Sequence, residues 1–288
     1  MTTNNIKPKR NHRLLYISHY LVDRPGQLIN LSYFVDFLNA AKSSISEDID
    51  FVRQVFEING LGEVKTFPGA NGGIIFYPKV PIEEQKELLN TLIEKFTNGK
   101  RILQGNYIHT SDILQDSFML SKVGRLIASH FVQRDIDAVM TVESKGIGLA
   151  TIVARYLNVP YVTARRDSTD AIGPTISVNY VAGSMQTVRK MELEKNSLKT
   201  HQRVLIVDDF LRNGGTVEGM ISLLDEFDCT PVGICVLGEN RSRETDGLIL
   251  PIDSLVTLQL VYNQDERRYE LDVQPGSLFN EVELEVES

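Results

Sequence analysis

The sequence VLIVDDFLRNGGTVEGM occupies residues 204–220 and decides the fold of the larger part of this chain. Its apolar start, VLIV, is typical of a buried strand, and Asp208 and Asp209 follow at the carboxyl end of that strand. R-N-G-G-T then turns into a helix whose first N–H groups have no partner inside the helix. In parallel α/β sheets, ligands bind at the carboxyl ends of the strands. The stretch therefore predicts a ligand site in an α/β fold.

The loop in this stretch has the chemistry to bind a sugar phosphate. Its glycines let the backbone approach an anion without a Cβ in the way, and the start of the helix offers free N–H groups. The two aspartates can accept hydrogen bonds from the vicinal hydroxyls of a ribose. The residues predicted to form this site are Asp208, Asp209, Phe210, Leu211, Arg212, Asn213, Gly214, Gly215 and Thr216.

Strands and helices alternate on both sides of the loop. IDAVMTV at 136–142 runs into ESKGIGLATIVARYL, and VPYVTARR follows before a long polar stretch over 168–200. RVLIVDDF, the helix GGTVEGMISLLDEF of 214–227 and VGICVL complete the pattern. This alternation predicts an α/β domain with a parallel sheet over residues 81–288.

Residues 1–80 have a different organisation, with three helices and a hairpin. Apolar side chains recur at helical spacing over 11–22, 31–40 and 44–58, and Ser44 with Glu47 resembles a capping box at the start of the third helix. GEVKTF and IIFYPK then read as two strands joined by the glycine-rich PGANGG. This is the order of a winged helix-turn-helix, which binds duplex DNA. A three-helix connecting domain without DNA binding is the alternative.

Charge is distributed in a way that fits a DNA-binding front. Nine Lys and Arg against seven Asp and Glu give residues 1–80 a net charge of +2, whereas 21 against 31 give residues 81–288 a net charge of −10. A basic front on an acidic protein suits local contact with phosphates. One small winged helix reads few base pairs, so we expect a homodimer on paired half-sites. The predicted DNA contacts are Lys9, Arg10, Lys42, Ser43, Ser44, Ser46 and Gly72.

Composition indicates a globular, two-domain protein. The 288 residues are 42% hydrophobic and 24% charged, which is enough to bury a core. No apolar run reaches the length of a membrane span and the N-terminus has no signal-peptide core, so we expect a cytoplasmic protein that does not enter a membrane. Cys229 and Cys235 are expected to be buried reduced thiols on one face of a strand. No zinc-ligand spacing occurs, and no metal site is predicted. Pro81 is expected to open a helix whose apolar face binds the two domains or a second subunit.

The order of apolar run, Asp-Asp, three residues, small residue and Gly-Gly-Thr resembles the phosphoribosyl pyrophosphate (PRPP) signature of the type I phosphoribosyltransferases. By this resemblance, the turn with Glu143, Ser144, Lys145 and Gly146 binds the pyrophosphate, and Lys145 supplies a counter-charge. Over residues 10–280 the chain is similar to the purine operon regulators of Gram-positive bacteria, especially in AKSSISED at 41–48, PGANGG at 68–73 and SVNYVAGS at 177–184.

That resemblance implies a winged helix joined to a phosphoribosyltransferase-like domain, in a dimeric repressor of purine biosynthesis and transport genes. PRPP would be its inducing effector, with or without Mg²⁺, and not a substrate, so no catalytic residue and no enzyme activity are expected. Tyr107 and Phe210 match residues of the family's effector pocket, where a competing purine nucleotide could also bind. Arg212 and Asn213 stand where the family has Lys and Ala, and RRDSTDAIGPT at 165–175 also departs from it.

Two other functions remain open at this point. One is an active purine phosphoribosyltransferase with an appended DNA-binding domain. The other is an activator, or a sensor of another nucleotide. The amino-acid sequence does not specify the operator. The sign of regulation at each promoter depends on where the operator lies relative to that promoter.

Overall fold

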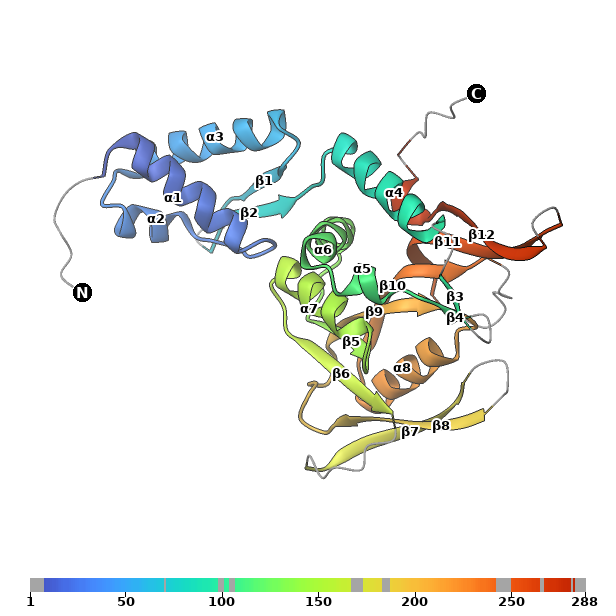
Figure 1. The fold of residues 1–288 in the computed structure, drawn as a ribbon. Helices are drawn as coiled ribbons and strands as arrows, with labels where there is room; N and C mark the ends of the chain where they lie inside the picture. Colours follow the sequence, from blue (N-terminus) through green and yellow to red (C-terminus); the bar gives the residue numbers. More distant parts are fainter. Residues whose placement is uncertain are drawn as a thin grey trace.

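The N-terminal lobe of the computed structural model is a winged helix-turn-helix (Figure 1). The structure describes residues 8–69, 71–97, 101–103, 107–166, 173–182, 187–241, 250–264, 267–280 and 282. The lobe contains, in order, α1 (Arg10–Asp23), α2 (Leu31–Phe37), α3 (Lys42–Ile58), β1 (Gly62–Phe67) and β2 (Gly73–Pro78). The predicted order of three helices and a hairpin is confirmed.

The core of this lobe lies between its helices and the hairpin. The apolar stripe of α3 points inward, and α1 and α2 add Ile17, Leu21 and Phe34 to the same cluster. The strands β1 and β2 pair antiparallel with Val64 opposite Phe76, and Ile74 also bridges to Ile29. These bonds fix the wing to the turn that precedes α2.

The predicted start of α3 is wrong. The helix begins at Lys42, and the amide of Ile45 already bonds to the carbonyl of Ala41, which is the N-cap residue and makes no side-chain cap. Ser44 therefore lies inside the first turn, where its side chain is half-buried, and cannot form a capping box with Glu47. The capping-box spacing was present, but the backbone had already turned helical two residues earlier.

The C-terminal region is built on an eight-stranded sheet in the order β12-β11-β10-β9-β5-β6-β8-β7. Its strands are β5 (Ala138–Val142), β6 (Tyr161–Arg166), β7 (Thr175–Ala182), β8 (Thr187–Glu194), β9 (Arg203–Leu211), β10 (Thr230–Asn240), β11 (Ile252–Asn263) and β12 (Arg268–Pro275). The five neighbours from β11 to β6 are parallel, and antiparallel strands extend both edges. The predicted α/β domain with a parallel sheet is confirmed.

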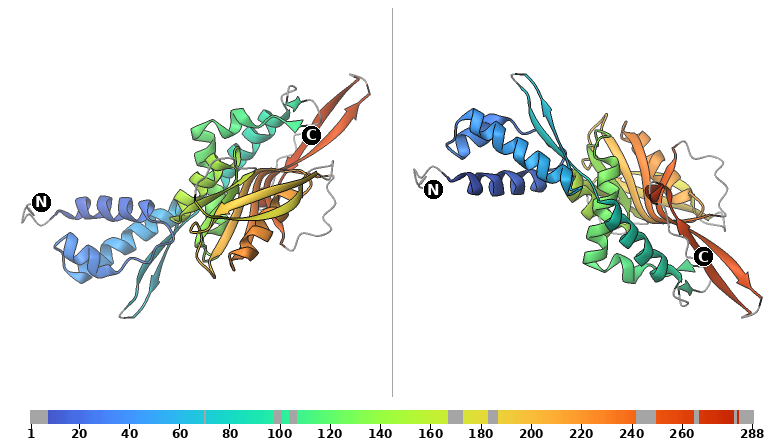
Figure 2. Two further views of the ribbon diagram at one scale, coloured as in Figure 1. Left: turned by 90° about the horizontal axis from the view of Figure 1, so that it is seen from below. Right: turned by 90° about the horizontal axis from the view of Figure 1, so that it is seen from above.

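Alternate residues of the central strands face two separate hydrophobic clusters, as the period of a strand requires. Val139 and Leu205 face the cluster of α4 (Ile82–Thr97), α6 (Ser117–Phe131) and α7 (Gly146–Leu157), whereas Met140 and Ile206 face that of α8 (Gly215–Glu226). The remaining short elements are β3 (Ile102–Leu103), β4 (Tyr107–Ile108), α5 (Ser111–Leu114) and the 3₁₀ turn Ser277–Phe279. In Figure 2 the β11–β12 hairpin projects at the end of the molecule opposite to the N-terminal lobe.

Two details of the sequence interpretation need correction. The polar stretch 168–200 contains β7 and β8, which form a hairpin that packs Tyr180 and Met191 against Gly219 of α8. Cys229 and Cys235 are buried and free, as expected, but they belong to opposite clusters. A register shift between Pro231 and Gly233 inserts a residue, so the even spacing no longer puts both thiols on one face.

Helix α4 does not have the role expected of it. Leu88, Leu89, Leu92 and Phe96 are buried in the same cluster as α6 and α7, so this apolar face is used within the C-terminal region. Within the part of the chain that the structure describes, every helix is too short or too polar to cross a lipid bilayer.

Candidate functional site

The two aspartates of the opening motif lie near the end of β9, between β5 and β10. The strand continues to Leu211, so both carboxyl groups are carried by extended backbone. Asp208 is only 4% exposed, and its Oδ1 accepts a hydrogen bond of 2.8 Å from the amide of Asp209. A carboxylate buried this deeply is costly unless a ligand or a cation meets it.

The electrostatics of the pair show this cost. Burial raises the pKa of Asp208 well above its ordinary value, and the charge of Asp209 adds to the effect. Burial also raises the pKa of Asp209, although the ammonium of Lys145 acts in the opposite direction. The site thus favours ligands that donate hydrogen bonds or bring positive charge.

The loop after β9 ends at the N-terminus of α8. Gly214 has a φ of +89°, in the left-handed region that favours glycine, and this turn directs the first N–H groups of α8 toward the end of the sheet. Arg166, from β6, reaches the same place and donates a 3.3 Å hydrogen bond from Nη2 to Thr216 Oγ1. A helix N-terminus, a hydroxyl and a guanidinium together form a site for a phosphate.

The second predicted loop follows β5 directly. Glu143, Ser144 and Lys145 are exposed, and Lys145 is the N-cap of α7. Gly146 is buried so tightly that a Cβ there would come within 2.3 Å of Thr141 Oγ1 and 2.8 Å of Asp208 Oδ1. The start of α7 therefore packs directly on the end of β9. The loop after β5 and the loop after β9 are in contact through Gly146 and Asp208.

A single cavity of about 500 Å³ joins the two loops. It is lined by all the predicted ligand-binding residues except Gly146, which lies beneath its floor: Tyr107, Glu143, Ser144, Lys145, Asp208, Asp209, Phe210, Leu211, Arg212, Asn213, Gly214, Gly215 and Thr216. These residues come from β4, from the carboxyl ends of the neighbouring central strands β5 and β9 and from the start of α8.

One further wall of the cavity was not predicted from the sequence. It consists of Arg166, Tyr180, Thr187 and Arg189, from β6 and the β7–β8 hairpin. The hydroxyl of Tyr180 is buried and has no hydrogen-bond partner within the described part of the chain. Arg166 reaches the cavity from the end of β6, whereas the β7–β8 hairpin brings Arg189 there.

The opposite wall carries Tyr107. Arg101 anchors this wall with a bidentate ion pair to Asp112, both contacts 2.7 Å, and a 2.8 Å bond to the carbonyl of His109. The hydrogen bond from Arg101 lowers the pKa of Asp112. The guanidinium of Arg212 lies over the Tyr107 ring, 4.8 Å from its centre, and so links the loop after β9 to the opposite wall.

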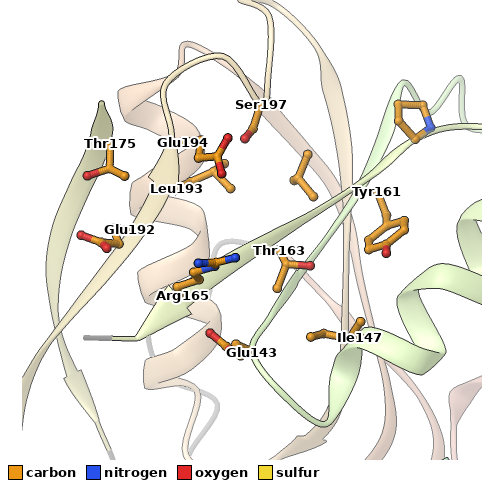
Figure 3. Close-up of a pocket in the computed structure, with 12 residues that line it drawn as sticks. Glu143, Ile147, Tyr161, Thr163, Arg165, Thr175, Glu192, Leu193, Glu194 and Ser197 are labelled. Atoms are coloured by element: carbon orange, nitrogen blue, oxygen red, sulfur yellow. The ribbon is translucent and has the colours of Figure 1, made fainter. Parts of the chain in front are cut away.

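A second cavity, of about 480 Å³, is also lined by Glu143, and Figure 3 shows the residues around it. It lies where β6 and β8 diverge. The two strands pair only where Arg165 and Arg166 of β6 lie opposite Glu192 and Met191 of β8. Arg165 and the carboxyl groups of Glu192 and Glu194 line it. Lys190 lies 2.7 Å from Glu192, so part of this charge is paired inside the chain.

The predicted DNA-binding residues lie on the N-terminal lobe but differ in accessibility. Lys9, Lys42, Ser43 and Ser46 are exposed around the starts of α1 and α3, whereas Ser44 is half-buried. The end of the wing, Ala70, and Lys7 lie outside the described residues.

Two of these residues have clear structural roles. Arg10 is 56% exposed but binds the buried Asp48 at 3.1 Å, and Arg13 binds the other oxygen of Asp48 at 2.6 Å. At Gly72 a Cβ would lie 2.1 Å from the carbonyl oxygen of Phe67, so the wing turn requires glycine there. The basic front of the chain is thus partly used to hold the lobe together.

In the described ranges, no group of three or more His, Cys, Asp or Glu side chains is arranged to hold a metal ion. Mg²⁺ at this site would therefore rest on Asp208, Asp209 and the oxygens of a bound ligand.

Two protein-family models match the chain. The model described as "Bacterial purine repressor, N-terminal" matches residues 9–78, and the one described as "Phosphoribosyl transferase domain" matches residues 109–254. The first match covers the winged helix and the second covers both ligand loops.

Curated relatives match nearly the full chain. The "Purine biosynthesis transcriptional repressor PurR" of Bacillus subtilis is 45% identical over 92% of this chain and 93% of its own length. The "Purine biosynthesis transcriptional activator PurR" of Lactococcus lactis subsp. lactis is 42% identical over 95% of this chain and 99% of its own length. The xanthine phosphoribosyltransferase of Oenococcus oeni is 27% identical over 61% of this chain and 89% of its own length.

Solved structures agree on the fold of the C-terminal region. Adenine phosphoribosyltransferase from Thermoanaerobacter pseudethanolicus superposes with a TM-score of 0.52 at 22% identity, covering 59% of this chain and 99% of that one. The enzyme from Rhodothermus marinus gives a TM-score of 0.51 at 21% identity, with 61% and 99% coverage. At these identities the likeness concerns the fold alone.

Proposed function

The chain belongs to the family of bacterial purine biosynthesis transcriptional regulators, and from this premise we propose that it represses purine biosynthesis and transport genes until PRPP releases it from DNA. The observation that carries the proposal is the single cavity in which the loop at the start of α8, two buried carboxyl groups and the loop of Lys145 meet. These three features correspond to the three parts of PRPP: the 5-phosphate, the ribose hydroxyls and the pyrophosphate.

Each part of PRPP has a complementary group. The start of α8, with Thr216 and Arg166, suits the 5-phosphate. Asp208 and Asp209 suit the vicinal hydroxyls, since donors would offset the cost of their burial. Lys145 suits the pyrophosphate, and Arg189 on the β8 wall adds a second cation. Mg²⁺ would enter with the pyrophosphate, which supplies most of the oxygen ligands.

We expect a purine nucleotide to compete for the same cavity. Phe210 packs on Gly238 and Tyr107 stands at the mouth, so both offer aromatic faces to a base. Because Arg212 already covers one face of Tyr107, a base has to use the other face or displace the guanidinium.

For the DNA partner we propose duplex operator DNA, contacted by the exposed start of α3 and by the wing. Lys42, Ser43 and Ser46 are short or flexible and accessible there. We expect a homodimer that reads two half-sites, in the cytoplasm. The sign of regulation is proposed as repression because the matching family model is that of a repressor domain.

The decisive experiment is a titration of PRPP against the protein bound to labelled DNA from upstream of purine biosynthesis genes. We expect release with Mg²⁺ and PRPP but not with ribose 5-phosphate or pyrophosphate alone, since each fills only part of the cavity. If PRPP left the complex intact while another nucleotide released it, the effector assignment would be wrong and the protein would be a sensor of that nucleotide.

The relatives that span nearly the whole chain are regulators of transcription, and the chain is accordingly a regulator and not an enzyme. The alternative, a phosphoribosyltransferase with an added DNA-binding domain, is tested by supplying PRPP, Mg²⁺ and each of adenine, guanine, hypoxanthine, xanthine and uracil. We expect no nucleotide, because an enzyme must also align a base with the ribose C1. Steady nucleotide formation that is lost in the Asp208→Ala variant would establish the enzyme.

A further inference from the structure

Helix α7 connects the ligand cavity to the winged helix. It starts at Gly146 in the loop beneath the cavity and ends at Leu157, against the N-terminal lobe. Its 12 residues make it about 18 Å long at 1.5 Å per residue. In Figure 1, α6 and α7 lie on the side of the C-terminal region that faces the lobe.

The end of α7 binds the end of α1. Nη2 of Arg155 lies 2.5 Å from Oδ1 of Asp23, and Nη1 donates a 3.3 Å bond to the carbonyl of Asp23. The other oxygen of Asp23 accepts a 3.0 Å bond from Arg24. Asp23 is the last residue of α1, so this pair holds the first helix of the DNA-binding lobe to a helix that starts at the cavity.

The turn after α1 adds a second contact. The amide of Gly26 bonds to the carbonyl of Phe76 in the wing strand β2 at 2.9 Å. A Cβ on Gly26 would lie 3.6 Å from Cγ2 of Val132, after α6, and 3.9 Å from the carbonyl oxygen of Leu157. The same turn therefore touches the wing and the ends of both α6 and α7.

Helix α7 is closely packed along its length. Leu149, Ala150, Val153 and Ala154 are buried, and a Cβ on Gly124 of α6 would lie only 2.4 Å from Cγ2 of Ile152. At its other end Gly146 has no free space toward Thr141 or Asp208. A ligand bound by Lys145 and the two aspartates therefore contacts the residues on which the start of α7 packs, and a close-packed helix can transmit a shift along its length.

We propose that Asp23 and Arg155 are positioning residues that set the orientation of the winged helix, and that the effector changes DNA affinity by moving Arg155 through α7. The inference rests on the proposed function, since it requires a phosphoribosyl ligand at the start of α7. Both side chains are partly exposed, at 38% and 56%, so the pair contributes little to folding stability. Its role is to couple two sites, which is a separate measurable quantity.

The test measures operator affinity with and without saturating PRPP in the full-length protein. Wild type is expected to lose affinity about 5- to 150-fold on adding PRPP, the usual range of allosteric coupling. Arg155→Ala and Asp23→Ala should each reduce this factor to 2-fold or less while binding PRPP normally by calorimetry. The double variant should be no worse than either single one, because both remove the same contact. The charge-swapped Asp23→Arg/Arg155→Asp protein should recover part of the response.

The matched control is Arg241→Ala. Arg241 forms a similarly exposed ion pair of 2.7 Å with Asp272 on β12. The Arg241→Ala variant should leave the response to PRPP unchanged. Small-angle scattering of the ligand-free proteins supplies a readout independent of the effector, in which Arg155→Ala should broaden the distribution of distances between the lobes.

The outcomes distinguish a failure of the proposed PRPP response from a failure of the positioning role of Asp23 and Arg155. If wild type ignores PRPP, the proposed function fails and the positioning role falls with it. If wild type responds and Arg155→Ala responds equally, with an unchanged scattering profile, only the positioning role is overturned. A loss of PRPP binding itself in Arg155→Ala would also overturn it, because the residue would then act on the cavity and not on the coupling.

Discussion

Buried carboxyl groups have opposite electrostatic environments in the DNA-binding lobe and in the ligand cavity. In the lobe, Asp48 is 1% exposed and is paired with two arginines inside the chain. In the cavity, Asp208 is buried almost as deeply, but burial and the charge of Asp209 raise its pKa well above the ordinary value. A structural carboxylate such as Asp48 is neutralised by cations of the same chain. In a ligand site, the free-energy cost of burying the charge remains until a ligand offsets it.

The largest effect should come from breaking the pair in the lobe. Arg13→Ala leaves Asp48 with the half-exposed Arg10 alone, and the free energy of unfolding should fall by about 3 kcal/mol, at the low end for a buried pair. Chemical denaturation followed by a probe in the lobe measures this loss. Lys86→Ala, which breaks an exposed pair with Glu83, should cost well under about 1 kcal/mol. Equal costs for both variants would remove the structural role of the Asp48 pair.

The next effect concerns the cavity. Asp208→Ala/Asp209→Ala should lower PRPP affinity by about 100-fold, which corresponds to about 2.7 kcal/mol, because the ribose hydroxyls lose their acceptors. Operator binding should be unchanged, so in cells repression would no longer be relieved. Calorimetry and fluorescence anisotropy measure the two affinities. Asp225→Ala, an exposed carboxylate on α8, is the control; release of the double variant at the wild-type PRPP concentration would refute the ribose assignment.

A smaller effect is expected at the DNA interface. Lys42→Ala should weaken operator binding by about 1–3 kcal/mol if the side chain reads a base, or reduce the salt dependence by about one unit if it meets a phosphate. PRPP binding should not change, since Lys42 lies at the start of α3. Anisotropy titrations at several salt concentrations distinguish the two cases, with Lys122→Ala on α6 as a control. Unchanged affinity would place Lys42 outside the interface.

The smallest effect is a gain in stability. A carboxyl group whose pKa is raised on folding costs nothing below its unfolded pKa, and the cost grows as the pH rises toward the folded pKa. Asp208→Asn removes the charge and keeps an oxygen for the amide of Asp209, so Tm should rise by about 2–4 °C at neutral pH, the shift that about 1 kcal/mol produces in a domain of this size.

The pH dependence sharpens this last prediction. The gain in Tm from Asp208→Asn should shrink as the pH falls and should vanish below about 4, because wild-type Asp208 is then protonated in both states. Scanning calorimetry across this range measures the difference, and Asp225→Asn should show none. A destabilised Asp208→Asn protein at neutral pH would mean that the buried carboxylate is already compensated without a ligand.

The sequence by itself determined the elements whose signals are local. The inward stripe of α3, from Ile45 to Phe56, and the strand, loop and helix of 204–220 are set by residues within one or two turns of each other. The two ligand loops could be predicted for the same reason, because glycines, a lysine and paired aspartates stand where the backbone changes direction. The parallel sheet then follows from the alternation of strands and helices.

Only the tertiary structure decided what depends on long-range register. The β7–β8 hairpin brings Arg189 and the buried Tyr180 hydroxyl to the cavity. Ile176, Val178 and Tyr180 alternate with polar residues along β7, but this local pattern does not specify that β8 pairs with β6 or that the hairpin packs on α8. The shift between Pro231 and Gly233 separated two cysteines whose spacing suggested a shared face. The contact of Asp23 with Arg155 joins residues 132 positions apart, and no local pattern specifies such a pair, because it forms only where the N-terminal lobe meets the C-terminal region.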